Sequence, residues 1–122
     1  MSERLRITIV GAAFAMVAAV VFAVDPSRTH LFPVCPFHQM TGLWCPGCGA
    51  TRAFHQLLHG NVMAAFRFNS LAMVMLPLAG YLMVRGDVST LKPGWVWGLL
   101  VVVVAFGVLR NIPAYPFTLL AP

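Results

Sequence analysis

Three long apolar runs constrain this chain more than any other feature of its sequence. They extend over residues 7–24, 69–84 and 95–109, and 60% of the whole sequence is hydrophobic while only 9% is charged. A soluble domain usually carries about 25% charged residues. A chain of 122 residues is also too short to bury so much apolar surface in a core of its own. The runs therefore predict an all-α integral membrane protein, with about three transmembrane helices in a single domain over residues 1–122.

The first apolar run is the one that a cleavable signal peptide would resemble. It extends from Ile7 to Val24, follows Arg4 and Arg6, and ends at Asp25-Pro26. The apolar part of a signal peptide has about 7 to 15 residues, whereas this run has about 18, close to the length needed to cross a bilayer. We therefore expect a membrane helix that is retained in the protein.

The second apolar run is interrupted near its start by polar side chains. Arg67, Asn69 and Ser70 stand where a membrane span would otherwise begin. This pattern predicts an interfacial helix over residues 61–68, followed by a span over 69–84 that bends at Pro77.

The third apolar run has the flanking residues that are typical of a membrane span. Trp95 and Trp97 are suited to one interface, and Arg110-Asn111 marks the other. A polar turn at residues 85–87 separates this run from the second. The proline-containing tail over residues 112–122 is expected to lie at the interface without a helix of its own.

The charge pattern bears on partners and on orientation. The net charge is +5, but the eight Lys and Arg residues stand singly near the ends of the apolar runs and form no basic stripe. This distribution argues against a nucleic-acid partner and favours the lipid bilayer. A cytoplasmic N-terminus would leave four basic residues on each side of the membrane, so the count of basic residues does not decide the orientation. We base the orientation on Arg4 and Arg6, the charges nearest the first run, and expect the N-terminus inside.

All three cysteines lie between the first two runs, in a segment rich in proline and glycine. Residues 26–49 are therefore predicted to form a tight, irregular loop. Cys45 and Cys48 form a C-x-x-C pair within a C-P-G-C-G turn, which resembles the knuckles of zinc ribbons, and Cys35 would be a third ligand. A simple packing role is the alternative, because small apolar side chains such as cysteine often fill space in membrane proteins.

Histidines near this segment are candidates for a fourth ligand. A short amphipathic helix is predicted over residues 50–59, ending at Gly60-Asn61, and its polar stripe contains Arg52, His55, Gln56 and His59. Two histidines four residues apart can reach one ion. An interfacial helix would show the same stripe without any metal. The histidines concerned are His30, His38, His55 and His59.

The string C-x9-C-P-G-C-G-x-T-R-A resembles the uncharacterised bacterial membrane family DUF2752. The resemblance covers about residues 35–71 and extends more loosely to Arg110-Asn111, although this chain has Asn69-Ser70-Leu71 where the family usually has Asn-Pro-Leu. His55 and His59 are not part of the family's pattern. The resemblance implies a bacterial inner-membrane protein and names no reaction. The positions it marks are Cys35, Thr41, Gly42, Cys45, Pro46, Gly47, Cys48, Gly49, Thr51, Arg52, Ala53, Gly60, Asn69 and Leu71.

Three functions are compatible with these features. The favoured one is a non-catalytic module whose cysteine loop binds a metal, with zinc as the candidate, or is stapled by its thiols. Such a module would serve as a scaffold or subunit for another membrane protein or a second copy. The second is thiol–disulfide exchange by Cys45 and Cys48, with Cys35 resolving. The third is a subunit of an oligomeric transporter or channel, which the lack of acidic residues in the spans disfavours. The few carboxylates are too scattered for a hydrolytic pair, so we do not expect an enzyme.

Overall fold

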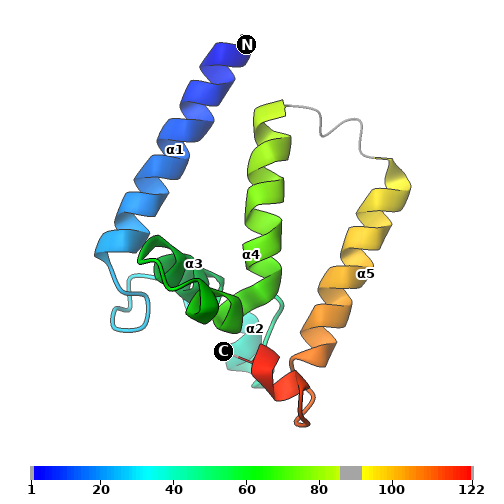
Figure 1. Ribbon diagram of the computed structural model, residues 1–122. Helices are drawn as coiled ribbons and strands as arrows, with labels where there is room; N and C mark the ends of the chain where they lie inside the picture. Colours follow the sequence, from blue (N-terminus) through cyan, green and yellow to red (C-terminus); the bar gives the residue numbers. More distant parts are fainter. Residues whose placement is uncertain (1, 86–91, 122) are drawn as a thin grey trace.

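The computed structural model describes residues 2–85 and 92–121, which are helical and contain no strand. Figure 1 shows α1, α4 and α5 as three long rods, with the short helices gathered at one end. The all-helical prediction is confirmed for the described residues, and Gly86 and Asp87 of the predicted turn lie outside them. In chain order the elements are α1 (Glu3–Ala23), α2 (Pro36–Thr41), α3 (Ala50–Leu58), α4 (Val62–Arg85), α5 (Pro93–Leu109) and the 3-10 helix η2 (Phe117–Leu120).

Two helices are long and apolar enough to cross a membrane. They are α1, with 21 residues and a mean hydropathy of 2.2, and α4, with 24 residues and a mean hydropathy of 1.5. Only 6% of the apolar window of α1 and 17% of that of α4 are buried, so neither is the core helix of a water-soluble fold. The apolar helix α5 has 17 residues, a length of about 26 Å against a hydrocarbon core of about 30 Å. The structure thus provides two candidate spans and a shorter apolar helix.

Helix α4 consists of two helical pieces that meet at Asn69. This residue has φ −163° and ψ 93°, the only non-helical backbone angles inside the helix. Its Oδ1 accepts a hydrogen bond from the backbone N–H of Ala72 at 2.9 Å, as an N-cap residue does. The break lies at the boundary between the interfacial segment and the span that the sequence predicts, and Pro77 lies within the second piece.

Two segments that the sequence predicts to be irregular contain short helices. The helix α2 has Pro36 in its first turn and ends at Gly42, whose φ of 71° is left-handed. Proline at the start and glycine at the end is the pattern that favours such a helix. In the tail, the chain forms the single turn of η2. The expectations of a wholly irregular cysteine loop and of a tail without a helix are therefore wrong at these two places.

Helix α3 packs closely against α4 through small side chains. Ala53 of α3 and Ala65 of α4 are fully buried and form a small core with Met73. The largest fully buried side chains of the described residues are polar, Asn69 and Arg110. The interior is thus polar where it is most tightly enclosed, and the outer surface is largely apolar.

Helix α3 also contacts the end of α1. The Nδ1 of His55 lies 2.6 Å from the backbone oxygen of Val21, and the ring of His59 stacks on Phe22 with centroids 4.3 Å apart. Gly60 follows with a left-handed φ of 81°, so the helix ends at the Gly60-Asn61 boundary that the sequence predicts. These contacts place α3 across the ends of the two longest helices, beside the cysteine segment (Figure 1).

Candidate metal centre

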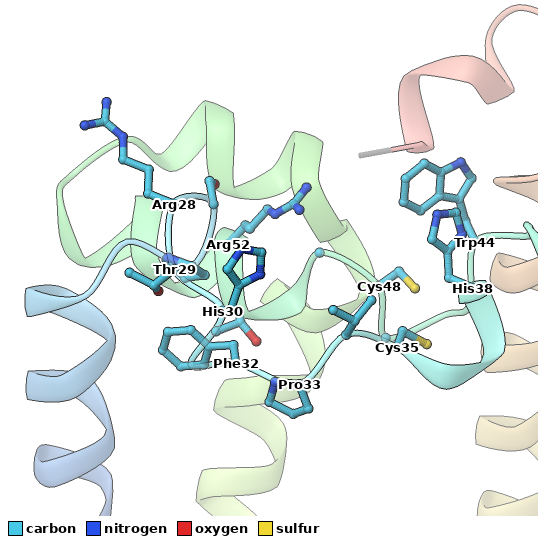
Figure 2. Close-up of a pocket in the computed structure, with 16 residues that line it drawn as sticks. Arg28, Thr29, His30, Phe32, Pro33, Cys35, His38, Trp44, Cys48 and Arg52 are labelled. Atoms are coloured by element: carbon cyan, nitrogen blue, oxygen red, sulfur yellow. The ribbon is translucent and has the colours of Figure 1, made fainter. Parts of the chain in front are cut away.

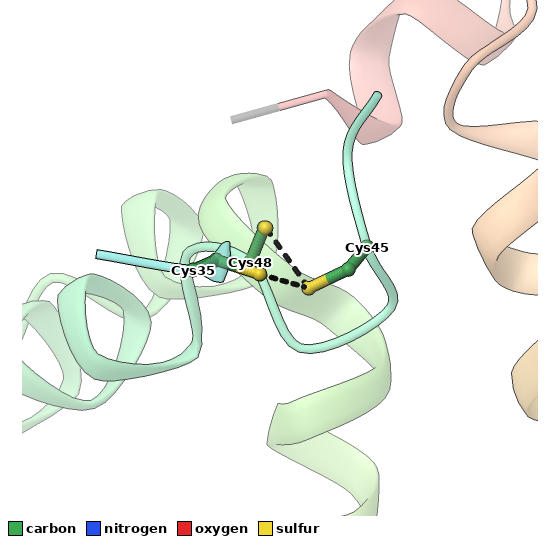
Figure 3. Close-up of side chains that lie close together, drawn as sticks. All are labelled: Cys35, Cys45 and Cys48. Carbon is green, nitrogen blue, oxygen red and sulfur yellow. Dashed lines mark hydrogen bonds between the residues drawn. The ribbon is translucent and has the colours of Figure 1, made fainter. Parts of the chain in front are cut away.

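Three thiols converge at the end of the molecule where the short helices gather. The Sγ of Cys45 lies 3.2 Å from that of Cys35 and 2.9 Å from that of Cys48. All three sulfurs lie within 4.8 Å of one another (Figure 3), and all three cysteines are free. Around tetrahedral zinc, Zn–S bonds of about 2.3 Å place the sulfurs roughly 3.8 Å apart. A small outward movement of the thiols would therefore create room for one ion.

The backbone of the C-P-G-C-G segment forms two consecutive turns. The N–H of Cys48 bonds to the oxygen of Cys45 at 3.1 Å, and the N–H of Ala50 bonds to the oxygen of Gly47 at 3.1 Å. Pro46 stands at the second position of the first turn, where its fixed φ is favourable. Gly49 has a φ of 82° and leads directly into α3. This local sequence explains why Cys45 and Cys48 face the same point.

The thiols differ in how readily they ionise. Burial raises the pKa of Cys48 to about 12, and its hydrogen bond with Cys45 acts in the same direction. Cys35 is the N-cap residue of α2, and the backbone N–H of His38, followed by the Cys45 thiol, lowers the pKa of Cys35 by hydrogen bonding to its sulfur. Because metals bind the thiolate form, Cys35 is better prepared than Cys48 for the first contact with an ion.

Arg110, at the end of α5, holds the turn from the far end of the sequence. Its Nη1 donates to the carbonyl oxygens of Cys45 at 2.9 Å, Cys48 at 3.0 Å and Pro46 at 3.4 Å. Its Nη2 donates to the oxygen of Phe68 at 3.4 Å, and the side chain is only 1% exposed. Burial lowers the pKa of Arg110, whereas the charges of Cys48 and Cys45 act in the opposite direction. One guanidinium thus connects α5, α4 and the C-x-x-C turn.

Two asparagines complete this hold on the cysteine segment. The Nδ2 of Asn69 donates to the oxygens of Pro46 at 2.8 Å and Cys48 at 3.1 Å. Asn111 forms a pair of hydrogen bonds with the backbone of Trp44, accepting from its N–H at 2.7 Å and donating to its oxygen at 2.8 Å. The backbone on both sides of Cys45 is therefore fixed by the side chains of Asn69 in α4 and Asn111 just after α5.

A close approach of α5 to the turn depends on Gly107. A Cβ atom at this position would lie 2.8 Å from the Cγ and 3.2 Å from the Cδ of Pro46. The first of these distances is too short for any real side chain. The absence of a side chain at Gly107 therefore allows Pro46, and with it the cysteine turn, to lie against α5.

A pocket of about 400 Å³ adjoins the thiols. Figure 2 shows His38 and Trp44 on the side toward which the sulfurs of Cys35 and Cys48 point. The two rings are stacked, with centroids 4.2 Å apart. The pocket gives an ion or a ligand access to the sulfurs from this side. It is also lined by several of the positions that the family resemblance marks: Gly47, Gly49, Thr51 and Arg52.

The candidate histidines occupy different places. His38 lines the pocket, and its Nδ1 lies 3.0 Å from the oxygen of Leu43, while the exposed His30 lies on the opposite part of the rim. His55 and His59 are engaged with α1 as described above. The group of potential ligand atoms found in the described residues contains the three cysteines and no histidine.

Four residues of this site do not stand out as such in the sequence. Trp44 acts through its backbone and Gly107 acts through its lack of a side chain. Neither property leaves a local signal in the sequence. Arg110 and Asn111 stand at the end of an apolar run, where interfacial charges are common. The loose extension of the family resemblance to this dipeptide is the one signal that could have assigned them to the site. These residues are Trp44, Gly107, Arg110 and Asn111.

Fold and site together define a small helical protein in which a thiol-rich turn lies at one end of long apolar helices. The family model described as "Protein of unknown function (DUF2752)" matches residues 35–83. These residues include all three cysteines and most of α4, and over this segment the match confirms the resemblance to the DUF2752 family that the sequence suggests. The chain matches no curated protein and no solved structure.

Proposed function

We propose that this chain is a small integral membrane protein that binds one structural metal ion, zinc, through Cys35, Cys45 and Cys48. In this proposal it acts as a non-catalytic scaffold or partner subunit, for another membrane protein or for a second copy. The observation that carries the proposal is the convergence of three free thiols within 4.8 Å. Clustered thiolates favour zinc and other thiophilic ions over hard cations such as magnesium.

His38 is the best candidate for the fourth ligand. Cys35 and His38 repeat the spacing of Cys45 and Cys48, with two residues between the members of each pair. The contact of its Nδ1 with the oxygen of Leu43 leaves Nε2 available, which is the usual arrangement of a metal-binding histidine. Its ring would have to move toward the sulfurs to complete a tetrahedral site, because it does not belong to the present group of ligand atoms.

A structural role is favoured by what surrounds the thiols. The carbonyls of the C-x-x-C turn are already bonded to Arg110 and Asn69, so an ion would join Cys35 to a turn that is held by two further helices. The carboxylates among the described residues are Glu3 and Asp25, and Asp25 pairs with Arg28 at 3.4 Å. Neither belongs to the ligand group, so neither stands ready beside the thiols as a general acid or base.

The membrane placement of the proposal rests on the arrangement of the long helices. In Figure 1 the N-terminal end of α1, the C-terminal end of α4 and the N-terminal end of α5 all point away from the end where the short helices gather. We place α1, α4 and α5 across a bacterial inner membrane, with the N-terminus in the cytoplasm and the thiols on the outer side. A reporter that is active only in the cytoplasm should work when fused after Arg85. Activity of the same reporter when it is fused after Arg28 instead would indicate the opposite orientation.

Metal analysis of the protein purified in detergent tests the proposed function. Elemental analysis should find about one zinc ion per chain, because a site with three thiolates and one imidazole holds one ion. The Cys45→Ser/Cys48→Ser variant, purified in parallel, is the matched control and should contain none. Protein that contains no stoichiometric metal, with zinc present during growth and purification, would contradict the proposal.

Thiol–disulfide exchange is the second candidate, and one observation favours it. Cys35 is half-buried, stands at the start of a helix and has a lowered pKa, while its sulfur contacts that of Cys45. Such a thiol is suited to attack a disulfide, so Cys35 would be the attacking thiol, whereas the sequence suggested the pair Cys45 and Cys48 with Cys35 resolving. In this case, the purified protein would contain little metal, and a disulfide would form between two of the cysteines on addition of a mild oxidant and disappear with a reductant.

A further inference from the structure

Arg110 is a buried cation without a carboxylate partner. It is 1% exposed, and its Nε has no hydrogen-bond partner. In residues 2–85 and 92–121 the one ion pair joins Arg28 to Asp25, on the exposed linker after α1. The contacts of Arg110 are all with carbonyl oxygens, three of them in the cysteine turn and one at Phe68.

Neutral carbonyls do not balance the charge of a buried guanidinium. A charge that is removed from water is costly unless a charge of the opposite sign lies close by. Arginine stays protonated under all ordinary conditions, so it cannot avoid this cost by losing its proton. The groups beside Arg110 that can become negative are the thiols of Cys45 and Cys48, whose own carbonyls it binds.

We propose that Arg110 is the counter-ion of the thiolate centre, a role that rests on the metal site proposed above. Three thiolates and a divalent ion carry one net negative charge when the fourth ligand is neutral, as an imidazole is. The single positive charge of Arg110 balances that charge. The centre, made of the ion, its ligands and Arg110, is then neutral overall. The balance holds for a divalent ion with an uncharged fourth ligand.

The test separates the charge of Arg110 from its hydrogen bonds. Arg110→Lys keeps the positive charge and loses most of the contacts with the turn, whereas Arg110→Gln loses the charge and keeps a hydrogen-bond donor. Asn69→Ala is the matched control, because it removes neutral donors to the oxygens of Pro46 and Cys48. Each full-length variant is purified in detergent and titrated with Co²⁺ against a competing chelator. The readouts are the thiolate-to-cobalt charge-transfer band and the helix content.

The expected result is a ranking by charge. Arg110→Gln should weaken Co²⁺ binding by at least about tenfold, because a charge at short range is lost, while Arg110→Lys should stay within about threefold of the unmodified protein. Asn69→Ala, which removes neutral hydrogen-bonding groups only, should weaken binding less than Arg110→Gln does. If Arg110→Lys binds as weakly as Arg110→Gln, or if Arg110→Gln binds as tightly as the unmodified protein, the inference is overturned and the metal site stands. If the unmodified protein binds no Co²⁺ at all, the metal site itself is refuted, and the inference with it.

Arg110→Gln could also fail to fold, and a second measurement keeps that case decisive. Cys35→His replaces one thiolate by a neutral ligand, so the centre would no longer need a positive partner. The double variant Cys35→His/Arg110→Gln should then recover helix content and Co²⁺ binding relative to Arg110→Gln alone, a favourable coupling between the two sites. A double variant that is as impaired as the sum of its single changes would contradict the counter-ion role.

Discussion

The two ends of this molecule are held together by different physical means. At the thiol end, side chains from α4 and α5 bind the backbone of a turn that lies far away in the sequence, and the most enclosed side chains are Asn69 and Arg110. At the opposite end of the long helices, residues 92–102 are all exposed. One end is therefore fixed by directional polar contacts, and the other presents apolar surface to its surroundings.

This contrast fits a protein whose surroundings are lipid. Lipid tails are as apolar as leucine side chains, so burying apolar surface between helices gives little driving force for their association. Hydrogen bonds that cross between segments, and close approaches that small residues permit, become the main specific contacts. In this chain both kinds meet at the cysteine turn. We therefore expect substitutions at the thiol end to matter far more than matched substitutions at the other end.

The largest effect is expected from removal of the central thiol. Cys45→Ser should abolish metal binding, because the Cys45 sulfur is the one that contacts both of the others, and hydroxyl groups are poor zinc ligands. The Cys45→Ser/Cys48→Ser variant should add little to the loss, since ligands of one ion act as a unit. Metal content and thermal unfolding in detergent are the measurements. Mild and additive effects would instead indicate that the cysteines only fill space.

The next effect is expected at Asn69. Asn69→Ala removes two hydrogen bonds to the cysteine turn and the cap on Ala72. We expect the free energy of unfolding to fall by about 1–3 kcal/mol, the usual cost of leaving buried polar groups without a partner. Asn61→Ala is the control, because the side chain of Asn61 forms an exposed hydrogen bond with Gln56 and should matter little. Equal losses of stability for the two variants would show that the buried hydrogen bonds of Asn69 contribute no more than the exposed one of Asn61.

A pair of glycines in α5 compares the two ends directly. Gly107→Ala should destabilise the protein by about 1–3 kcal/mol, because its Cβ would overlap the ring of Pro46. Gly98→Ala has open space around it and should be neutral or stabilising by up to about 1 kcal/mol, since alanine favours a helix. Thermal unfolding of both variants in the same detergent gives the comparison. A change in stability of the same sign for both variants would contradict the expected difference between the two ends.

How much of this could be predicted from the sequence depends on the range of the contacts concerned. The apolar helices follow from composition, although α1 begins before its apolar run, because the side chain of Ser2 caps a first turn that contains Glu3, Arg4 and Arg6. The break in α4 follows from the polar residues near Asn69. The cysteine cluster follows from the spacing of Cys45 and Cys48 within a proline- and glycine-rich segment.

The remaining features depend on contacts between distant parts of the chain. The bond between Arg110 and Cys45 joins residues that are 65 positions apart, and the pair formed by Asn111 and Trp44 spans 67 positions. Periodicity and local spacing carry no information on such contacts. The short helix α2 could have been recognised from Pro36 and Gly42, whose pattern is hidden among the other prolines and glycines of the segment.

The smallest effect is expected at the histidines that face α1. His55→Ala removes a hydrogen bond to the oxygen of Val21 and should cost about 1 kcal/mol of stability, with metal content unchanged. His38→Ala is the informative partner, because loss of the fourth ligand should weaken metal binding at little cost to packing. Loss of metal in His55→Ala but not in His38→Ala would show that the assignment of the fourth ligand to His38 is wrong.

Protection of the three thiols by metal tests the central claim most directly. The protein is purified in detergent without reductant and treated with an alkylating reagent, before and after addition of a chelator, and the labels are located by mass spectrometry. The account predicts that Cys35, Cys45 and Cys48 are protected at first and that all three become accessible with the chelator. Cys35 should then react before Cys48, because its pKa is lowered while that of Cys48 is raised to about 12. Three thiols that react fully without a chelator would contradict the account, as would protection that only a reductant removes.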